Sequence, residues 1–240
     1  MPGPRIPRLT PEHLTLVHRD IADPGPVLIE GYRPAEDADY DAEIERILAT
    51  APTPDDFWVF GYGSLIWSPC YTFLEQRTGV AQGWHRSFTL GWDYRFRGSR
   101  DTPGLMMAID RGGQCRGVVH RLPAEGLRAQ LDRLIRREMS MVPTAFPGRW
   151  ITVKTAEGPV SALTFAMNRK SSRYIGGLTP EATADVLARA CGYKGSMAQY
   201  LHATVVQLEQ LGIHDSYLWR LQGLVADRID AARLGVRPDA

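Results

Sequence analysis

Residues 57–67 of this 240-residue chain read Phe57-Trp58-Val59-Phe60-Gly61-Tyr62-Gly63-Ser64-Leu65-Ile66-Trp67. The aromatic and β-branched residues at the start of this segment predict a buried strand. Two glycines follow almost at once, and glycine lets the main chain turn tightly and approach a ligand with bare N–H groups. Such a turn can hold an anion or a developing oxyanion, but an ordinary corner between a strand and a loop has the same composition. The glycine spacing fits neither the dinucleotide fingerprint nor the phosphate-binding loop.

The composition is that of an ordinary soluble globular protein, with 44% hydrophobic and 23% charged residues. The formal net charge is +1, which gives no electrostatic reason to expect nucleic acid or a membrane as the partner. No apolar stretch is long enough to span a bilayer, and the N-terminus lacks the apolar core of a secretory signal. The three cysteines, Cys70, Cys115 and Cys191, lie far apart, which predicts reduced thiols and a cytoplasmic protein without a zinc site.

The pattern of the chain changes near residue 55. Residues 1–55 read as an N-terminal extension that is partly helical, with a helix start at Thr10-Pro11 and a second helix over residues 39–48. A segment rich in proline and glycine separates the two helices. We therefore expect an extension that packs on a main domain of residues 56–240.

The main domain begins with strands and ends with helices. Its strand-like segments are residues 57–60, 78–81, 86–92, 105–109, 115–121, 150–154 and 160–167, and residues 110–113 are predicted to be a hairpin turn between two of them. Helices are expected at 179–191, at 196–212 and from residue 215 onward, each beginning at a capping side chain. This order predicts an α+β fold: a largely antiparallel, curved or barrel-like sheet with flanking helices.

One further helix, at residues 123–139, lies between the strands. Its apolar positions form one face and are Leu127, Leu131, Leu134 and Ile135. Glu138 falls about three turns after the first of them, so a carboxylate is expected at the buried face and at the C-terminal end. Burial and the partial negative charge of a helix C-terminus both raise the pKa of such a carboxyl group. Glu138 is therefore a candidate base, although a structural ion pair with a nearby arginine is an open alternative.

Other polar residues are weaker candidates. Ser64 lacks the Gly-x-Ser-x-Gly context of a nucleophile and is better read as a hydrogen-bonding residue. His120 is predicted to be a packing or surface residue, and Cys70 has no recognisable partner. Tyr174 precedes Gly176-Gly177, a plausible hinge, so it is either a lid residue or an ordinary loop contact.

Together these residues resemble the ChaC-like gamma-glutamylcyclotransferases. The likeness rests on residues 59–67, which look like the signature of that family, and on later segments in the same order. Those segments are Gly83-Trp84-His85-Arg86-Ser87-Phe88, Arg97-Gly98-Ser99, Pro103-Gly104, Gly117-Val118-Val119-His120-Arg121-Leu122, Arg137-Glu138-Met139, Tyr174 and Gln199-Tyr200-Leu201. The resemblance runs from about residue 57 to residue 224 and does not include the extension.

The resemblance implies a compact mixed β-barrel with flanking helices and a cavity above the glycine turn. It implies an enzyme that cleaves glutathione to 5-oxoproline and cysteinylglycine, a small-molecule reaction without metal or cofactor. Glu138 would be the catalytic base. The substrate-binding residues would be Gly61, Tyr62, Gly63, Ser64, Leu65, Ile66 and Tyr174.

Two positions depart from the family pattern. Thr144 stands where the family often has tyrosine, and Leu105 stands where it often has arginine. Both changes concern recognition of the cysteinylglycine end. A cyclotransferase for other γ-glutamyl peptides or amines is therefore the alternative within the enzyme class, and a catalytically silent γ-glutamyl-binding protein is the alternative outside it.

Overall fold

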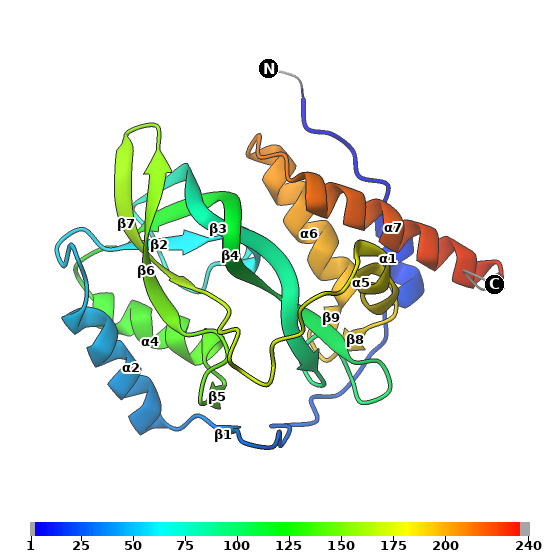
Figure 1. Ribbon diagram of the computed structural model, residues 1–240, viewed down its shortest axis with the longest axis horizontal. Coiled ribbons are helices and arrows are strands. Elements are labelled where there is room, and N and C mark those ends of the chain that lie inside the picture. Colours follow the sequence, from blue (N-terminus) through cyan, green and yellow to red (C-terminus); the bar gives the residue numbers. More distant parts are fainter. Residues whose placement is uncertain (1–2, 236–240) are drawn as a thin grey trace. The chain divides into compact units, whose positions relative to one another are not determined.

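The structure, a computed structural model, describes residues 3–235 (Figure 1). The chain forms two compact units, and each is made of segments that are separate in the sequence. One unit consists of residues 28–87 and 108–172 and contains most of the strands. The other consists of the described parts of residues 1–27, 88–107 and 173–240 and is mainly helical.

The sheet closes on itself as a barrel in the order β2-β4-β3-β6-β7. These strands are β2 (Trp58–Gly61), β3 (Glu75–Asp93), β4 (Gly104–Arg121), β6 (Gly148–Thr155) and β7 (Gly158–Phe165). Strand β2 pairs antiparallel with β4 and parallel with β7, while β6 pairs antiparallel with both β3 and β7. The predicted α+β fold with a mixed, largely antiparallel barrel is therefore confirmed.

The predicted hairpin turn at residues 110–113 is wrong. Strand β4 continues through this segment, and its two glycines, Gly112 and Gly113, have φ angles of 110° and 64°. Left-handed glycines are also the mark of a β-bulge, which bends a strand without reversing it. The segments 78–81 and 86–92 likewise belong to one strand, β3, which contains Gly83 with a φ of 80°.

The core of the barrel unit lies between the barrel and two helices, α2 (Asp37–Ala49) and α4 (Leu127–Glu138), which pack on each other. Its buried side chains include Ile44, Ile47, Phe57, Val59, Leu65, Leu131, Leu134, Ile135, Leu163 and Phe165. The predicted apolar face of α4 is thus confirmed at its three central positions. Two short strands of the same unit, β1 (Arg33–Pro34) and β5 (Met141–Val142), pair antiparallel with each other.

The helical unit contains α1 (Pro11–Val17), α5 (Pro180–Leu187), α6 (Met197–Gln210) and α7 (Ser216–Arg233), with the small strands β8 (Cys191–Gly192) and β9 (Gly195–Ser196). The three predicted caps are present, because the side chains of Thr179, Ser196 and Asp215 each accept a hydrogen bond from a main-chain N–H in the first turn. No helix among the described residues is long and apolar enough to cross a bilayer.

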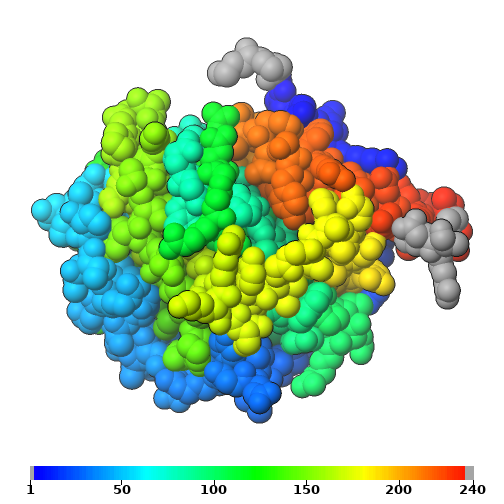
Figure 2. All heavy atoms as spheres, in the orientation of Figure 1, coloured from blue at the N-terminus to red at the C-terminus, as the bar shows by residue number. Residues whose placement is uncertain are grey.

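The N-terminal chain packs closely within this helical unit. Figure 2 shows it, in dark blue, lying along the orange and red helices α6 and α7. Leu9 is completely buried, and its N–H donates to Gln222 Oε1 (2.8 Å). A boundary between an extension of residues 1–55 and a domain of residues 56–240 stays a prediction.

Candidate active site

The glycine turn joins β2 to a single helical turn, α3 (Ser64–Trp67). The side chains of Tyr62, Leu65 and Ile66 are buried, so these residues offer mainly their main chain to a ligand. Gly63 has a φ of −137°, which shows that the turn does not use the left-handed conformation. The N–H of Ile66 donates to Gly63 O (2.9 Å) and is therefore used inside the turn. The amides at the start of such a helical turn have no partner within it.

Three contacts fix the turn on the barrel. The hydroxyl of Tyr62 donates to Phe165 O on β7 (2.9 Å), and the buried Arg86 donates from Nε to Tyr62 O (2.6 Å). Gly117 on β4 allows the close approach, because a Cβ at that position would lie 2.4 Å from Gly61 O. Arg86 was noted from the sequence only as part of the family resemblance, because a buried arginine inside a strand has no local signature.

Glu138 is the last residue of α4, and its side chain is only 17% exposed. Burial raises the pKa of this carboxyl group above its ordinary value, and the Arg137 guanidinium acts in the opposite direction. Arg137 Nε lies 3.3 Å from Glu138 Oε1, so the arginine pairing considered above is present. Arg137 Nη2 also donates to Ser64 Oγ (2.8 Å), which connects the carboxylate to the glycine turn through one side chain.

The segment after α3 supplies two further titratable groups, Cys70 and Tyr71. Burial, with a smaller contribution from Glu138, raises the pKa of the half-buried Cys70 thiol and of the buried Tyr71 hydroxyl. Tyr71 Oη lies 3.1 Å from His120 Nδ1, and His120 Nε2 lies 2.9 Å from Gln76 Oε1. With Gln76 as acceptor, Nε2 bears the proton and Nδ1 accepts from the tyrosine.

His120 is therefore a buried packing residue, as one of the two sequence readings proposed. It is completely buried, and burial lowers its pKa to about 4, so the ring is neutral near pH 7. Among residues 3–235, no three His, Cys, Asp or Glu side chains gather as metal ligands would.

Tyr174 belongs to the helical unit. It forms an antiparallel bridge with Leu90, and the neighbouring Ile175 N–H donates to Thr89 O (2.8 Å). A Cβ at Gly176 would lie 2.6 Å from the Tyr174 ring, so this glycine makes room for the aromatic side chain. These contacts are those of an ordered loop residue, and a role for Tyr174 in substrate binding stays a prediction.

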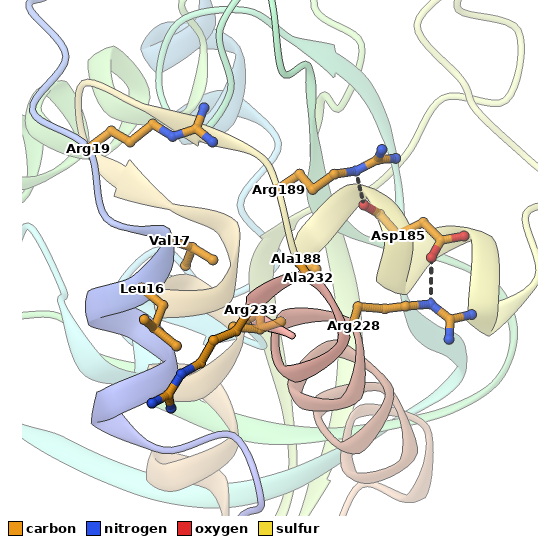
Figure 3. A pocket seen from close by; sticks show the side chains of 10 residues that line it. Leu16, Val17, Arg19, Asp185, Ala188, Arg189, Arg228, Ala232 and Arg233 are labelled. Carbon is orange, nitrogen blue, oxygen red and sulfur yellow. Dashed lines mark hydrogen bonds and ion pairs between the residues drawn. The ribbon is translucent and has the colours of Figure 1, made fainter. Parts of the chain in front are cut away.

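The helical unit also contains a cavity of about 640 Å³, shown in Figure 3. Two of its arginines contact Asp185 on α5: Arg189 Nε donates to Asp185 O (2.9 Å), and Arg228 Nε lies 2.6 Å from Asp185 Oδ1. None of the residues predicted to bind substrate lines this cavity. Its volume alone therefore does not make it the active site.

Comparison with known proteins identifies a family match that includes the glycine turn and Glu138. The family model for "ChaC-like protein" matches residues 57–228. A glutathione-specific gamma-glutamylcyclotransferase of Escherichia coli (strain K12) is 36% identical over 178 residues, which cover 74% of this chain and 76% of that protein. The human glutathione-specific gamma-glutamylcyclotransferase 1 is 29% identical, over 62% of this chain and 68% of that protein.

The fold has a solved counterpart as well. A crystal structure of a yeast gamma-glutamyl cyclotransferase specific to glutathione superimposes with a TM-score of 0.64 at 20% identity, covering 72% of this chain and 96% of that one. At this identity the likeness concerns the fold.

Proposed function

The chain belongs to the ChaC-like protein family, and from this premise we propose that it is a gamma-glutamylcyclotransferase that cleaves glutathione to 5-oxoproline and cysteinylglycine. The observation that supports the proposal most is the placement of Glu138. A carboxylate with a raised pKa lies at the buried end of α4 and is connected through one arginine to the glycine turn after β2. A protein that only binds γ-glutamyl groups has no need of a base there.

The reaction is an internal displacement. The α-amine of the γ-glutamyl group attacks its own γ-carbonyl carbon, a five-membered ring forms, and the amide bond to the cysteine nitrogen breaks. Because both reacting groups belong to one molecule, the protein mainly has to hold the bent conformer. The amine must lose a proton first, and a free α-amine titrates at about 7.7–8.0. Glu138 accepts a proton from the attacking nitrogen and passes it to the departing nitrogen, and the second proton that the ammonium form loses on becoming the ring N–H goes to solvent, so no metal or cofactor is required.

A raised pKa suits Glu138 to this task. A general base works best when its pKa lies near the operating pH, and an exposed glutamate at about 4.3 is too weak. We place the γ-glutamyl moiety at Gly61, Tyr62, Gly63, Ser64, Leu65 and Ile66, where main-chain amides of the turn would bind its α-carboxylate or the oxyanion. The buried side chains of the turn support this arrangement, since they hold the main chain in place.

The family resemblance also makes Tyr174 a proposed substrate-binding residue, through a hydrogen bond from its hydroxyl group. Tyr174→Phe removes only the hydroxyl group, so it separates this role from ring packing against Gly176. We expect a higher KM in the variant. Wild-type kcat and KM together would exclude the hydroxyl from the site.

The substrate could also be another γ-glutamyl peptide, because two positions depart from the family pattern. Leu105 is completely buried, and the Thr144 hydroxyl accepts a hydrogen bond from the Phe146 N–H (3.3 Å). Incubating the pure protein with glutathione and, separately, with γ-glutamyl-alanine, and measuring 5-oxoproline in each, decides between the two substrates. We expect product from glutathione and little from γ-glutamyl-alanine.

The control for this assay is each substrate incubated without protein, which reports spontaneous cyclisation. No product above this control from either substrate would refute the enzymatic function and leave a silent binding protein. We also propose a cytoplasmic location, supported by the three free cysteines, which suit a reducing compartment.

A further inference from the structure

One arginine at the end of α4 has a distinct partner for each of its guanidinium nitrogens. Arg137 Nε faces the Glu138 carboxylate (3.3 Å), Nη2 donates to Ser64 Oγ (2.8 Å), and Nη1 donates to Ser68 O. Ser64 is the first residue of α3 and Ser68 is its C-cap. The side chain is 28% exposed, so most of it is covered by the protein.

We propose that Arg137 is the positioning residue of the site: it holds the Glu138 carboxylate at a fixed distance from the turn proposed to bind the γ-glutamyl group. This inference rests on the function proposed above. A guanidinium is planar and its N–H donors point at fixed angles, so three simultaneous contacts define how the Glu138 carboxylate is oriented relative to α3. A lysine could supply the charge but not this geometry.

Two of these contacts also tie together the two ends of α3. The N–H of Ser68 donates to Ser64 O (2.8 Å), which closes the single helical turn, and Arg137 then bonds to the side chain of the first residue and the carbonyl of the other. A helix of one turn is not stable by itself. Arg137 therefore stabilises the main chain next to the glycine pair as well as the carboxylate.

The charge of Arg137 matters because the other titratable groups that face Glu138 are neutral. These groups are Cys70 and Tyr71, and burial raises the pKa of both, so each keeps its proton near pH 7. Within residues 3–235, Arg137 is the one charged side chain in contact with Glu138. Among the described residues, this guanidinium is the group that offsets the effect of burial on the pKa of the carboxyl group.

The same helix supplies a matched control, Arg136. It lies one position earlier and its side chain is 43% exposed. It forms ion pairs with Asp132 and Asp37, both at 2.8 Å, and it contacts neither Glu138 nor the glycine turn. Arg136→Gln therefore removes the same charge from the same helix without touching the site.

The first test does not depend on activity. The carboxyl group of Glu138 is titrated by NMR in the wild type, in Arg137→Gln and in Arg136→Gln. An opposite charge at this range changes a pKa by about 1–3 units, so we expect the pKa of Glu138 to rise by at least about one unit in Arg137→Gln and to stay in place in Arg136→Gln. Equal values in all three proteins would overturn the inference.

The second test separates positioning from charge. Arg137→Lys keeps the charge, so the acid limb of the pH profile of kcat/KM should stay at its wild-type position. Its kcat should nevertheless fall by about tenfold to 10²-fold, the loss expected from a misplaced base. Wild-type kcat in Arg137→Lys would overturn the positioning role, and circular dichroism with a melting curve confirms that each variant is folded.

The two proposals fail in different ways. If the wild type makes no 5-oxoproline from any γ-glutamyl substrate, the proposed function is refuted, and the NMR titration still decides whether Arg137 controls Glu138. If the wild type is active but Arg137→Gln and Arg136→Gln share its pH profile and its kcat, the function stands and the inference about Arg137 is refuted.

Discussion

Replacing Glu138 by glutamine is the sharpest test of the mechanism. Glutamine has nearly the same volume and still offers an oxygen to Arg137, but it cannot accept a proton. General-base catalysis contributes about 10²–10⁴-fold, so kcat for 5-oxoproline formation should fall by at least about 10²-fold. Substrate affinity should change much less, because the amides of the turn remain in place.

The effect on stability can be worked out from the contacts. The variant exchanges a charged hydrogen bond of about 1.5–3 kcal/mol for a neutral one of about 0.5–1.5 kcal/mol, and it removes the cost of keeping a charge in a site that is 17% exposed. Arg137 retains Ser64 Oγ and Ser68 O as acceptors. The net change should stay within about 1 kcal/mol, which is a shift in Tm of less than about 4 °C in a chain of this size.

A purely structural ion pair predicts the opposite pattern. Removing one partner of a buried pair costs about 3–5 kcal/mol, so Tm would fall by at least about 6 °C and activity would fall only with the folded fraction. Both quantities should be measured on one preparation. A folded Glu138→Gln protein with wild-type kcat would refute the assignment of Glu138 as the base.

The same pair of proteins gives a pH dependence of known sign. Because the folded state raises the pKa of Glu138, this group stabilises the wild type below its unfolded pKa of about 4.3, and the contribution is lost as pH rises through the folded pKa. The stability of Glu138→Gln relative to the wild type should therefore increase from pH 4 to pH 8. A difference that is constant over this range would contradict the raised pKa.

Three further predictions concern the framework of the site. Gly117→Ala should displace the glycine turn and cost about 1–3 kcal/mol of stability, because the new Cβ would lie 2.4 Å from the main-chain oxygen of Gly61. In the control Gly223→Ala the new Cβ meets no atom within 4 Å, so urea denaturation should show a neutral or slightly stabilising effect. His120→Gln should lose less stability than the wild type as the pH falls from 6.5 to 4. Because the pKa of His120 is lowered to about 4, the neutral ring contributes roughly 3 kcal/mol above pH 6.5, and this contribution is lost as pH falls through 4. Equal slopes of the free energy of unfolding against pH in the two proteins would contradict this. Ile47→Ala removes a completely buried side chain and should cost about 2–5 kcal/mol of stability. Leu16, which is 51% exposed, is the control, and Leu16→Ala should cost less than about 0.5 kcal/mol. Equal small losses in both variants would show that residues 1–55 are separable from the barrel core.

Features that depend on neighbours in sequence could be predicted well. The apolar face of α4 follows from a repeat of 3.6 residues, and the three helix caps follow from single side chains that bond to their own first turn. The barrel follows from several strands with short connections and a buried first strand. Each of these rests on local physics that one sequence contains.

Features that depend on a distant partner could not be predicted in the same way. The glycines of β4 look alike whether the strand reverses or bends, and pairing with the neighbouring strands decides the outcome. Tyr71 and His120 are separated by 49 residues and meet only because β4 passes the segment after α3. No spacing rule connects them, so sequence reasoning left His120 as a packing or surface residue and did not single out Tyr71.

The position of Glu138 shows why two readings of one residue need not compete. From the sequence, a catalytic base and a structural ion pair with an arginine stood as alternatives. The structure contains the ion pair, and the ion pair is what a buried base requires. Burial alone would raise the pKa until the carboxyl group kept its proton and could accept none. A guanidinium at 3.3 Å acts to lower the pKa of this group, while burial, the larger effect, raises it. The pKa of Glu138 depends on both effects, and the contacts of Arg137 with Ser64 and Ser68 keep the guanidinium and the carboxylate beside the turn proposed to bind the γ-glutamyl group.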